Sequence, residues 1–388
     1  MKPHLSAAWH ALLGGLALLL LPLAAMAQVQ NLVIHKADGT LVRYNVQDID
    51  SMTIEDIPRW ANRSEEARRL LTYLQEGVGQ KMLSGVHASV NYNSYEAEWV
   101  YRHTGKYPAV NCIDFIHDIY SGSWINYSDP SVWKDWTNKR GIMAAMWHWG
   151  MPTNDGTSHT CSPGDDPDRT SFHPSAIFDP TSEDYKTMIA RIDQVAEWLK
   201  PMAAARVPIL WRPLHEAQGN WTEANPGTSW HHAWFWWGID GPEAFVELWR
   251  VMYDRMVGYH GLTNLIWVYT AGDSMRWYPG DEYVDVISFD FYNKDVAQMR
   301  KWYDFARSHF PSKLCAISEF GSIADIADVW ADGQYWSFMI SWWDNARTKD
   351  PKSEEFKSEE HSNADIPYWR RALEQDFIIT RDELPNFR

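Results

Sequence analysis

Short apolar runs alternate with amphipathic helical patterns from Ser64 to the end of the chain. The runs have the length of buried strands, and the segments between most of them repeat apolar residues at helical spacing. Strands that alternate with helices favour a parallel sheet with crossover helices, and eight such units fit a closed barrel. The pattern therefore predicts an α/β fold, a (β/α)8 TIM barrel. The eight runs are 82–87, 109–114, 142–148, 207–211, 265–269, 284–290, 314–318 and 335–342, and the helical patterns include 96–104, 130–139, 183–200, 242–257, 294–309 and 366–374.

Residues 1–27 have the composition of an export signal. Lys2 is the only charge before position 27, an apolar core runs from Ala11 to Leu23, and Ala25-Met26-Ala27 is a small-x-small cleavage site. We expect cleavage before Gln28 and a mature chain that is exported to the periplasm or beyond. No other stretch is long and apolar enough to predict a membrane span.

Residues 28–58 predict a small β appendage in front of the barrel, which we assign to 59–388. The runs 31–35 and 41–46 flank Asp38-Gly39, a hairpin signal. A short further strand is expected within 48–56, and Pro58 joins the appendage to the barrel. Weak packing or partial disorder of this segment is an equally good interpretation.

Two carboxylates follow two of the predicted strands. Glu216 comes after 207–211 through Arg212-Pro213-Leu214-His215, and Glu319 comes after 314–318. Catalytic residues of α/β barrels lie at the carboxyl ends of the strands, and strands four and seven face each other across the mouth. Two facing carboxylates are the equipment for glycoside hydrolysis, and a separation of about 5–5.5 Å would give retention of configuration. One acid must then be kept protonated and the other ionised.

Other interpretations of this stretch explain less. His215-Glu216 resembles part of a zinc protease motif, but position 219 is Gly rather than His and the stretch is a strand. A purely structural role suits Arg212, which we expect to pair with Glu319. It does not suit Glu216, because an unpaired carboxylate near a barrel core is costly.

Charge and aromatic content indicate a neutral polymeric ligand. The net charge of −16 argues against nucleic acid or an anionic membrane as a partner. Of the 24 Trp residues, several fall in the long loop 217–240, where an apolar ring beside polar residues can stack on a sugar. The loop 150–181 is also long, which is typical of functional loops.

No metal or cofactor is expected. Three Cys residues allow at most one disulfide, and Cys112 and Cys315 fall in strand patterns, where we expect buried thiols. Histidines in the loops lack a second pair at ligand spacing, and a group of aspartates lacks a full calcium-loop signature. These groups are His173 with His231-His232, and Asp165-Asp166 with Asp168. The charged segment 349–363 is expected to be solvated.

The chain resembles glycoside hydrolase family 26, chiefly β-mannanases, over about residues 64–385. The resemblance rests on four motifs that are specific together. They are Arg212-Pro213-Leu214-His215-Glu216, Trp234-Phe235-Trp236-Trp237-Gly238, Asp290-Phe291-Tyr292 and Ser318-Glu319-Phe320-Gly321.

The resemblance implies a role for each matching residue. Glu216 is implied as the acid/base and Glu319 as the nucleophile, and Tyr292 should donate a hydrogen bond to the nucleophile. The sugar sites should further include His148, Trp149, Arg212, His215, Trp234, Asp290 and, as the floor of the −1 subsite, Trp342.

The chain departs from the family pattern at two places. Residues 220–233 separate the acid/base from the Trp-rich motif, so either Trp221 or Trp234 can fill the family's position; its neighbours favour Trp234. Met151 stands before Pro152, where the family often has Asn.

The predicted function is retaining, endo-acting hydrolysis of β-1,4-mannosidic bonds in mannan, galactomannan or glucomannan. Two alternatives stay open: another β-glycan, such as mixed-linkage glucan or β-1,3-xylan, and a non-catalytic sugar-binding barrel. The expected partner is the polysaccharide, and we expect a monomer, although the sequence leaves the oligomeric state open.

Overall fold

The computed structural model describes residues 31–35, 41–49, 62–88, 92–345 and 351–388. The chain divides into two compact units, Met1–Asp56 and Ile57–Arg388. The predicted export signal, residues 1–27, and the expected joint at Pro58 lie outside the described residues.

The first unit contains the predicted hairpin. Strands β1 (Asn31–His35) and β2 (Leu41–Asn45) pair antiparallel, with Asn31 opposite Asn45. A 3-10 turn, Val46–Asp48, follows β2. Most of the predicted further strand, 48–56, lies outside the described residues. Exposed apolar side chains on both strands show that this ribbon buries little surface of its own, as expected for two strands alone: Val33, Ile34, Leu41 and Tyr44.

The second unit is an eight-stranded parallel barrel within residues 62–88, 92–345 and 351–388. Each strand pairs with the next in chain order, and the last pairs with the first, which closes the ring. The predicted TIM barrel is confirmed. Its strands are β3 (Met82–His87), β4 (Val110–Asp114), β5 (Ile142–Trp147), β8 (Ile209–Pro213), β9 (Leu265–Thr270), β10 (Val286–Tyr292), β11 (Leu314–Gly321) and β12 (Phe338–Ser341).

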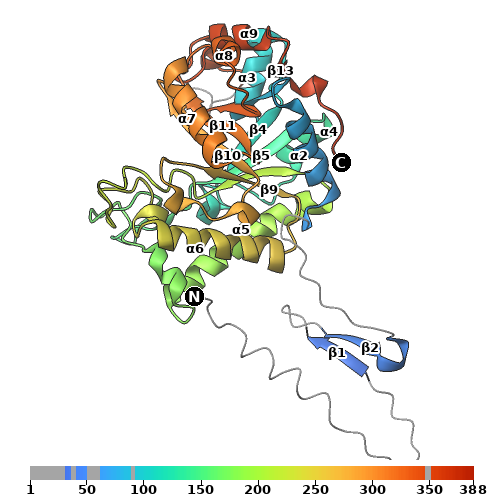
Figure 1. Ribbon diagram of the computed structural model, residues 1–388, viewed down its shortest axis with the longest axis vertical. Helices are drawn as coiled ribbons and strands as arrows, with labels where there is room; N and C mark the ends of the chain where they lie inside the picture. Colours follow the sequence, from blue (N-terminus) through green and yellow to red (C-terminus); the bar gives the residue numbers. More distant parts are fainter. Residues whose placement is uncertain (1–30, 36–40, 50–61, 89–91, 346–350) are drawn as a thin grey trace, which may run out of the picture. The chain divides into compact units, whose positions relative to one another are not determined.

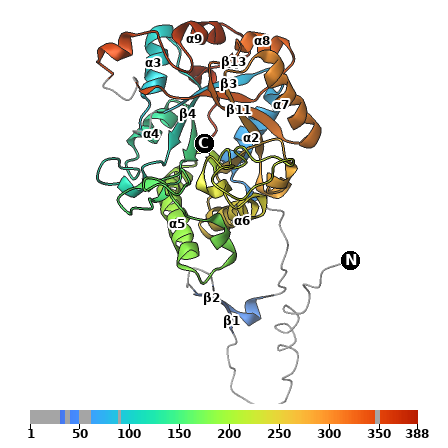
Figure 2. The same cartoon turned by 90° about the vertical axis from the view of Figure 1, so that its left-hand side faces the viewer.

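Helices surround the strands (Figure 2). Several begin at a side-chain cap: Ser64 and Ser182 each accept a hydrogen bond from a first-turn N–H, and Asp295 forms a capping box with Gln298. The short α8 and the two-residue strand β13 (Ile378–Ile379) were not predicted. The helices are α2 (Glu65–Gly77), α3 (Tyr95–Thr104), α4 (Ser131–Asn138), α5 (Glu183–Ala204), α6 (Pro242–Tyr253), α7 (Val296–His309), α8 (Ile326–Ala331) and α9 (Ile366–Leu373).

Successive side chains of a strand serve two different cores. On β5, Met143 and Ala145 belong to the layer between strands and helices, whereas Ala144 and Met146 belong to the cluster that includes Leu70 of α2. This division follows from the two-residue period of a strand. Both clusters are apolar, and the polar side chains of the strands lie mainly at their carboxyl ends.

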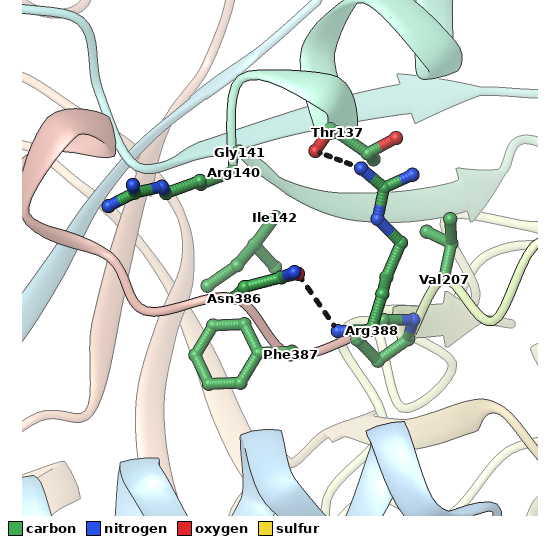
Figure 3. A pocket seen from close by; sticks show the side chains of 9 residues that line it. Thr137, Arg140, Gly141, Ile142, Val207, Asn386, Phe387 and Arg388 are labelled. Atoms are coloured by element: carbon green, nitrogen blue, oxygen red, sulfur yellow. Dashed lines mark hydrogen bonds between the residues drawn. The ribbon is translucent and has the colours of Figure 1, made fainter.

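The C-terminal tail packs at the opposite end of the barrel, in the same buried cluster as α2. Phe387 is buried, and the Arg388 guanidinium donates to the Thr137 carbonyl at 2.9 Å (Figure 3). A small cavity of about 20 Å³ remains there, beside Ile142 at the start of β5. This volume suits about one water, so the feature is a small packing gap at the end of the barrel.

The charged side chains in the described part of the segment after β12 are exposed, as predicted, but the segment also makes contacts that were not predicted. Within its described part, Phe356 is buried, the Trp99 indole donates to the Ser358 carbonyl at 2.9 Å, and His103 contacts the Phe356 carbonyl at 3.0 Å. The segment 351–363 therefore packs on α3. These partners lie more than 250 residues apart in sequence, so local charge density did not reveal the contact.

The two long loops contact each other. In 150–181, β6 (Met151–Pro152) pairs antiparallel with β7 (His159–Thr160). The backbone N–H of Trp236, in 217–240, donates to the Cys161 carbonyl at 3.0 Å. In Figure 1 the loops that follow the strands gather on the left, at the carboxyl end of the barrel.

Candidate active site

A buried guanidinium joins four strands at the mouth of the barrel. Arg212, at the end of β8, donates from Nη1 to Glu319 Oε2 at 3.1 Å and from Nη2 to the Asp290 carboxylate. Its Nε donates to Thr270 Oγ1 at 2.9 Å. The predicted pair between Arg212 and Glu319 is confirmed, and Asp290 is a second partner that the sequence had not assigned to Arg212.

Both oxygens of Glu319 have donors. Arg212 contacts one, and the Tyr292 hydroxyl donates to the other, as predicted. A Cβ at Gly321 would lie 2.8 Å from the Tyr292 ring, so glycine after Glu319-Phe320 leaves room for this tyrosine. Burial and repulsion from Asp290 raise the pKa of Glu319 to about 7, although Arg212 and Tyr292 act to lower it. Glu319 is thus an oriented carboxylate above neutral pH.

Glu216 lies just beyond β8, in a tight turn. Leu214 and Glu216 both have left-handed backbone, with φ of 50° and 52°. Such values are uncommon for non-glycine residues and gather at functional sites. Burial, followed by repulsion from Asp290 and Glu319, raises the pKa of Glu216 to about 9, and its carboxyl hydrogen-bonds to Asp290.

The charges of the cluster explain this order of pKa values. Glu216, Asp290 and Glu319 surround one guanidinium, so three ionised carboxylates would leave uncompensated negative charge in a buried site. A proton is retained, and it resides on Glu216, which Arg212 does not contact directly. The arrangement therefore holds one carboxylic acid beside one carboxylate near neutral pH, as double displacement requires.

Two histidines pack beside the acids. His148 Nε2 lies 3.2 Å from His215 Nε2, and His148 Nδ1 lies 2.6 Å from Asp114 Oδ2. Burial lowers the pKa of His215, with the Arg212 charge adding to the effect, so this ring is neutral. Burial opposes protonation of His148 too, but the Asp114 carboxylate outweighs it and raises the pKa.

Asp114 is a site residue that the sequence analysis missed. It ends the apolar strand β4, and the rule that singled out Glu216 and Glu319, a carboxylate at the carboxyl end of a barrel strand, also applies to it.

Exposed aromatic rings border the acids. Trp342, just beyond β12, is half-buried, and its ring centroid lies 4.9 Å from that of His87 and 5.8 Å from that of His148. Trp234 is 47% exposed and lines a pocket of about 460 Å³ together with Glu216. Trp221 also borders this pocket but is 3% exposed and packs edge-on against Trp277. Of the two candidates, Trp234 has the ring that is open to a ligand.

Trp149 does not lie where the resemblance placed it. The side chain is fully buried, stacks on Trp147 at 4.2 Å and meets Trp236 edge-on at 4.9 Å. The physical reason is the two-residue period of extended backbone, which sends Trp147 and Trp149 to one side and His148 to the other. Trp149 supports the loop that carries His148 and offers no surface to a sugar.

The weaker candidates have other partners. His173 pairs with Asp240 at 2.8 Å, and Asp165 accepts a hydrogen bond from the Trp230 indole. Among the described residues, no three His, Cys, Asp or Glu side chains group as metal ligands. All three Cys are free, and Cys112 and Cys315 are buried as expected. Within the same part of the chain, every helix is too short or too polar to cross a bilayer.

Residues 60–364 match the family described as glycosyl hydrolase family 26. A mannan endo-1,4-beta-mannosidase of Thermothelomyces thermophilus is 32% identical, over 83% of this chain and 62% of its own length. Mannan endo-1,4-beta-mannosidase A of Piromyces sp is 30% identical over 83% of this chain and 49% of its own. The chain thus spans about half to three fifths of the length of these curated relatives.

Solved structures of the same family are also similar to this chain. The family 26 domain of an endo-beta-mannanase/endo-beta-glucanase from Prevotella bryantii has a TM-score of 0.73 and 31% identity, covering 84% of this chain and 98% of that one. A beta-mannanase from a symbiotic protist of the termite Reticulitermes speratus, complexed with gluco-manno-oligosaccharide, has a TM-score of 0.68 and 28% identity, covering 87% and 100%. The chain belongs to glycosyl hydrolase family 26.

Proposed function

We propose that the protein is a retaining endo-β-1,4-mannanase. The observation that carries this proposal is the pairing of a protonated Glu216 with an oriented Glu319 at the ends of β8 and β11. Retaining glycosidases need one carboxylic acid to protonate the leaving oxygen and one carboxylate to attack the anomeric carbon. The names of the relatives support mannan as the polymer.

In the first step, Glu319 attacks the anomeric carbon while Glu216 gives its proton to the departing glycosidic oxygen. The new ester removes the charge of Glu319. Arg212 is not left unpaired, because Asp290 still holds its second nitrogen. The buried cation therefore stays balanced through the covalent intermediate.

In the second step, Glu216 removes a proton from water, which attacks the glycosyl-enzyme. The charge of Glu319 raises the pKa of Glu216 in the free protein, and the ester no longer carries that charge. The pKa of Glu216 should therefore fall once the intermediate has formed. This change lets one residue act first as an acid and then as a base.

A second candidate is hydrolysis of another β-glycan, mixed-linkage glucan or β-1,3-xylan. One relative is named endoglucanase H, at 27% identity over 166 residues, and the Prevotella bryantii domain comes from a protein named as both mannanase and glucanase. Mannose differs from glucose by one axial hydroxyl, and no described contact assigns a residue to that group.

Hydrolysis of a substrate panel tests the proposal. We expect reducing ends to appear fastest with mannan, galactomannan and glucomannan, with a mixture of oligosaccharides early in the reaction because cleavage is internal. Faster hydrolysis of lichenan or β-1,3-xylan would favour the second candidate. A folded protein that binds these polymers but releases no reducing sugar would indicate a non-catalytic sugar-binding barrel.

We also propose that the protein is exported and cleaved before Gln28, on the strength of the apolar segment 11–23 and Ala25-Met26-Ala27. N-terminal sequencing of exported material should start at Gln28. Exported protein that starts at Met1 would contradict this.

A further inference from the structure

A buried carboxylate and a buried imidazole meet outside the cluster of acids, between α3 and the segment 358–364. Glu96, in the first turn of α3, and His361 have side chains that are 2% and 1% exposed, and Glu96 Oε2 lies 3.1 Å from His361 Nε2. The two residues lie 265 positions apart in the chain. Burial of such groups is costly unless each has hydrogen-bond partners, and neither residue takes part in the two steps of hydrolysis.

Backbone hydrogen bonds determine which nitrogen of His361 carries the proton. Its Nδ1 accepts the backbone N–H groups of Asn363 and Ala364, each at 3.0 Å. The ring proton therefore belongs on Nε2, which donates to Glu96. The other oxygen of Glu96, Oε1, accepts the backbone N–H of Asp344 at 2.8 Å. Glu96 thus connects the turn that contains His361 to the residues that follow β12.

The residues that follow β12 include Trp342, two positions before the contact with Glu96. The Trp342 N–H donates to the Phe320 carbonyl at 2.8 Å, on the strand that carries the proposed nucleophile. The Asp344 carboxylate accepts from the backbone N–H of Ser362 at 2.7 Å and from its hydroxyl at 2.5 Å. The residues after β12 and the segment that contains Ser362 therefore fix each other in place.

Asn363 connects the same segment to the end of β11. Its carbonyl accepts the Ser322 N–H at 2.7 Å, and its side-chain amide donates to the Trp343 carbonyl at 3.0 Å. A Cβ at Gly321 would lie 2.3 Å from Asn363 Oδ1, so the amide packs directly on the backbone two residues beyond the proposed nucleophile. The segment therefore contacts the ends of two strands that carry site residues, β11 and β12.

We propose that Glu96 and His361 are positioning residues for the proposed hydrolysis. Through Asp344 and Asn363 they fix Trp342 and the end of β11 beside the −1 sugar. This inference rests on the proposed function, because it takes Trp342 as the floor of the −1 subsite. Both side chains are buried and touch no substrate. Distortion of the −1 sugar belongs to the transition state, so loss of the contact should lower kcat and leave KM nearly unchanged.

Two conservative variants remove the contact. Glu96→Gln keeps the size of the side chain, but its single amide oxygen can accept from only one of the two donors, His361 or the Asp344 N–H. His361→Asn keeps an oxygen in the place of Nδ1 but is too short to replace Nε2. We expect each variant to lower kcat on β-1,4-linked mannohexaose about tenfold, with KM changed less than about twofold, since small displacements in an active site can cost this much.

The double variant shows whether the two residues act as one unit. Residues that act only through their mutual contact have non-additive effects, because the first substitution already removes the contact. The kcat of the double variant should therefore equal that of the single variants within about twofold. A loss equal to the product of the single losses, about a hundredfold, would mean that each residue acts separately and would contradict the proposal.

Asp285→Asn is the matched control. Asp285 accepts the backbone N–H of Trp267 at 2.8 Å and pairs with Arg63 at 2.7 Å, so it too is a largely buried carboxylate with one backbone and one side-chain partner. It lies directly before β10, at the end of the barrel away from the acids. Its substitution should lower the melting temperature as the others do, but it should leave kcat and KM unchanged.

Hydrogen exchange followed by mass spectrometry adds a measurement that does not depend on activity. The peptides that contain Asp344 and Ser322 should exchange faster in Glu96→Gln and His361→Asn than in the unaltered protein, and no faster in Asp285→Asn. Either single variant suffices if the other does not fold.

The proposal is wrong if exchange in these peptides is unchanged, if kcat equals that of the control, or if KM rises while kcat stays constant. Failure of the unaltered protein to hydrolyse mannan would instead contradict the proposed function, and hydrogen exchange would still show whether the contact fixes the two strand ends.

Discussion

The carboxylate of Asp114 accepts two hydrogen bonds from His148, one from Nδ1 at 2.6 Å and one from the backbone N–H at 3.0 Å. These bonds fix the ring of His148 and direct its Nε2 toward His215, the residue before Glu216. Strand β4 is thereby connected to the acid on β8. The relationship makes Asp114 a positioning residue that acts through His148.

Asp114→Asn tests this role. An amide oxygen accepts hydrogen bonds but an amide nitrogen does not, so one of the two donors of His148 loses its partner. We expect kcat/KM on mannan to fall about tenfold, which corresponds to about 1.4 kcal/mol. The pH profile should change as well, because the Asp114 charge that raises the pKa of His148 is lost.

Asp304→Asn is the control, since Asp304 is exposed on α7 and pairs with Arg300 at 3.4 Å. It should leave the kinetics unchanged. Activity and pH profile of Asp114→Asn equal to those of the control would show that the contact is only structural.

The activity of the unaltered protein should have a bell-shaped pH profile set above the usual range of carboxyl groups. The rate should rise as Glu319 ionises, with a pKa of about 7, and fall as Glu216 loses its proton, with a pKa of about 9. Tyr292→Phe removes a hydrogen bond that lowers the pKa of Glu319. We expect its acidic limb to move to higher pH while the alkaline limb moves less.

The profile of kcat/KM measures these limbs in the free protein. An acidic limb of Tyr292→Phe that stays in place, or moves to lower pH, would contradict the assigned role of the tyrosine.

Glu216→Gln should stabilise the fold, and the gain should grow with pH. The pKa of Glu216 is raised to about 9 in the folded state, so between its unfolded pKa of about 4.3 and this value the folded state binds the proton more tightly. The stability contributed by protonated Glu216 is present in full below its unfolded pKa and is lost as pH rises toward its folded pKa. Thermal unfolding at several pH values should show equal melting temperatures near pH 4 and a higher one for Glu216→Gln at pH 8.

Glu282→Gln is the control, because Glu282 is exposed, in the 3-10 turn Asp281–Tyr283. A stability difference for Glu216→Gln that does not depend on pH would contradict the raised pKa.

Truncation of Trp342 should affect mainly activity, whereas truncation of Trp149 should affect mainly stability. Trp342 is half-buried at the mouth, so Trp342→Ala should lower kcat/KM by about tenfold with little loss of stability. Trp149 is fully buried between Trp147 and Trp236, so Trp149→Ala should cost about 3–5 kcal/mol of unfolding free energy. Thermal unfolding and steady-state kinetics on both variants check this. Unchanged kinetics in a folded Trp342→Ala would assign that ring to the core.

The repeating units and the pair of acids were predictable from sequence because both depend on local patterns. Apolar runs such as 314–318 identify the strands, and the residues that follow each run lie at the mouth. The Arg212–Glu319 pair and the Tyr292–Glu319 hydrogen bond were also expected, the first from the cost of a buried charge and the second from the resemblance.

What was missed depends on contacts between distant parts of the chain. The packing of Phe356 on α3 depends on residues that are distant in sequence. The burial of the Trp149 side chain against Trp236 depends on such a contact too. Asp114 was overlooked for a different reason. Its position at the carboxyl end of β4 was a signal that was not used, and only its contact with His148 shows its role.

The anomer formed in azide rescue tests the central assignment most directly. With an aryl β-mannobioside that has a good leaving group, Glu216→Ala should form the glycosyl-enzyme and stall, and added azide should restore turnover and give the β-azide. Glu319→Ala should show no burst and should give only the α-azide, from attack on the vacated face. NMR of the products distinguishes the two. The account predicts the β product from Glu216→Ala and the α product from Glu319→Ala; the reverse pattern would contradict the assignment of acid/base and nucleophile.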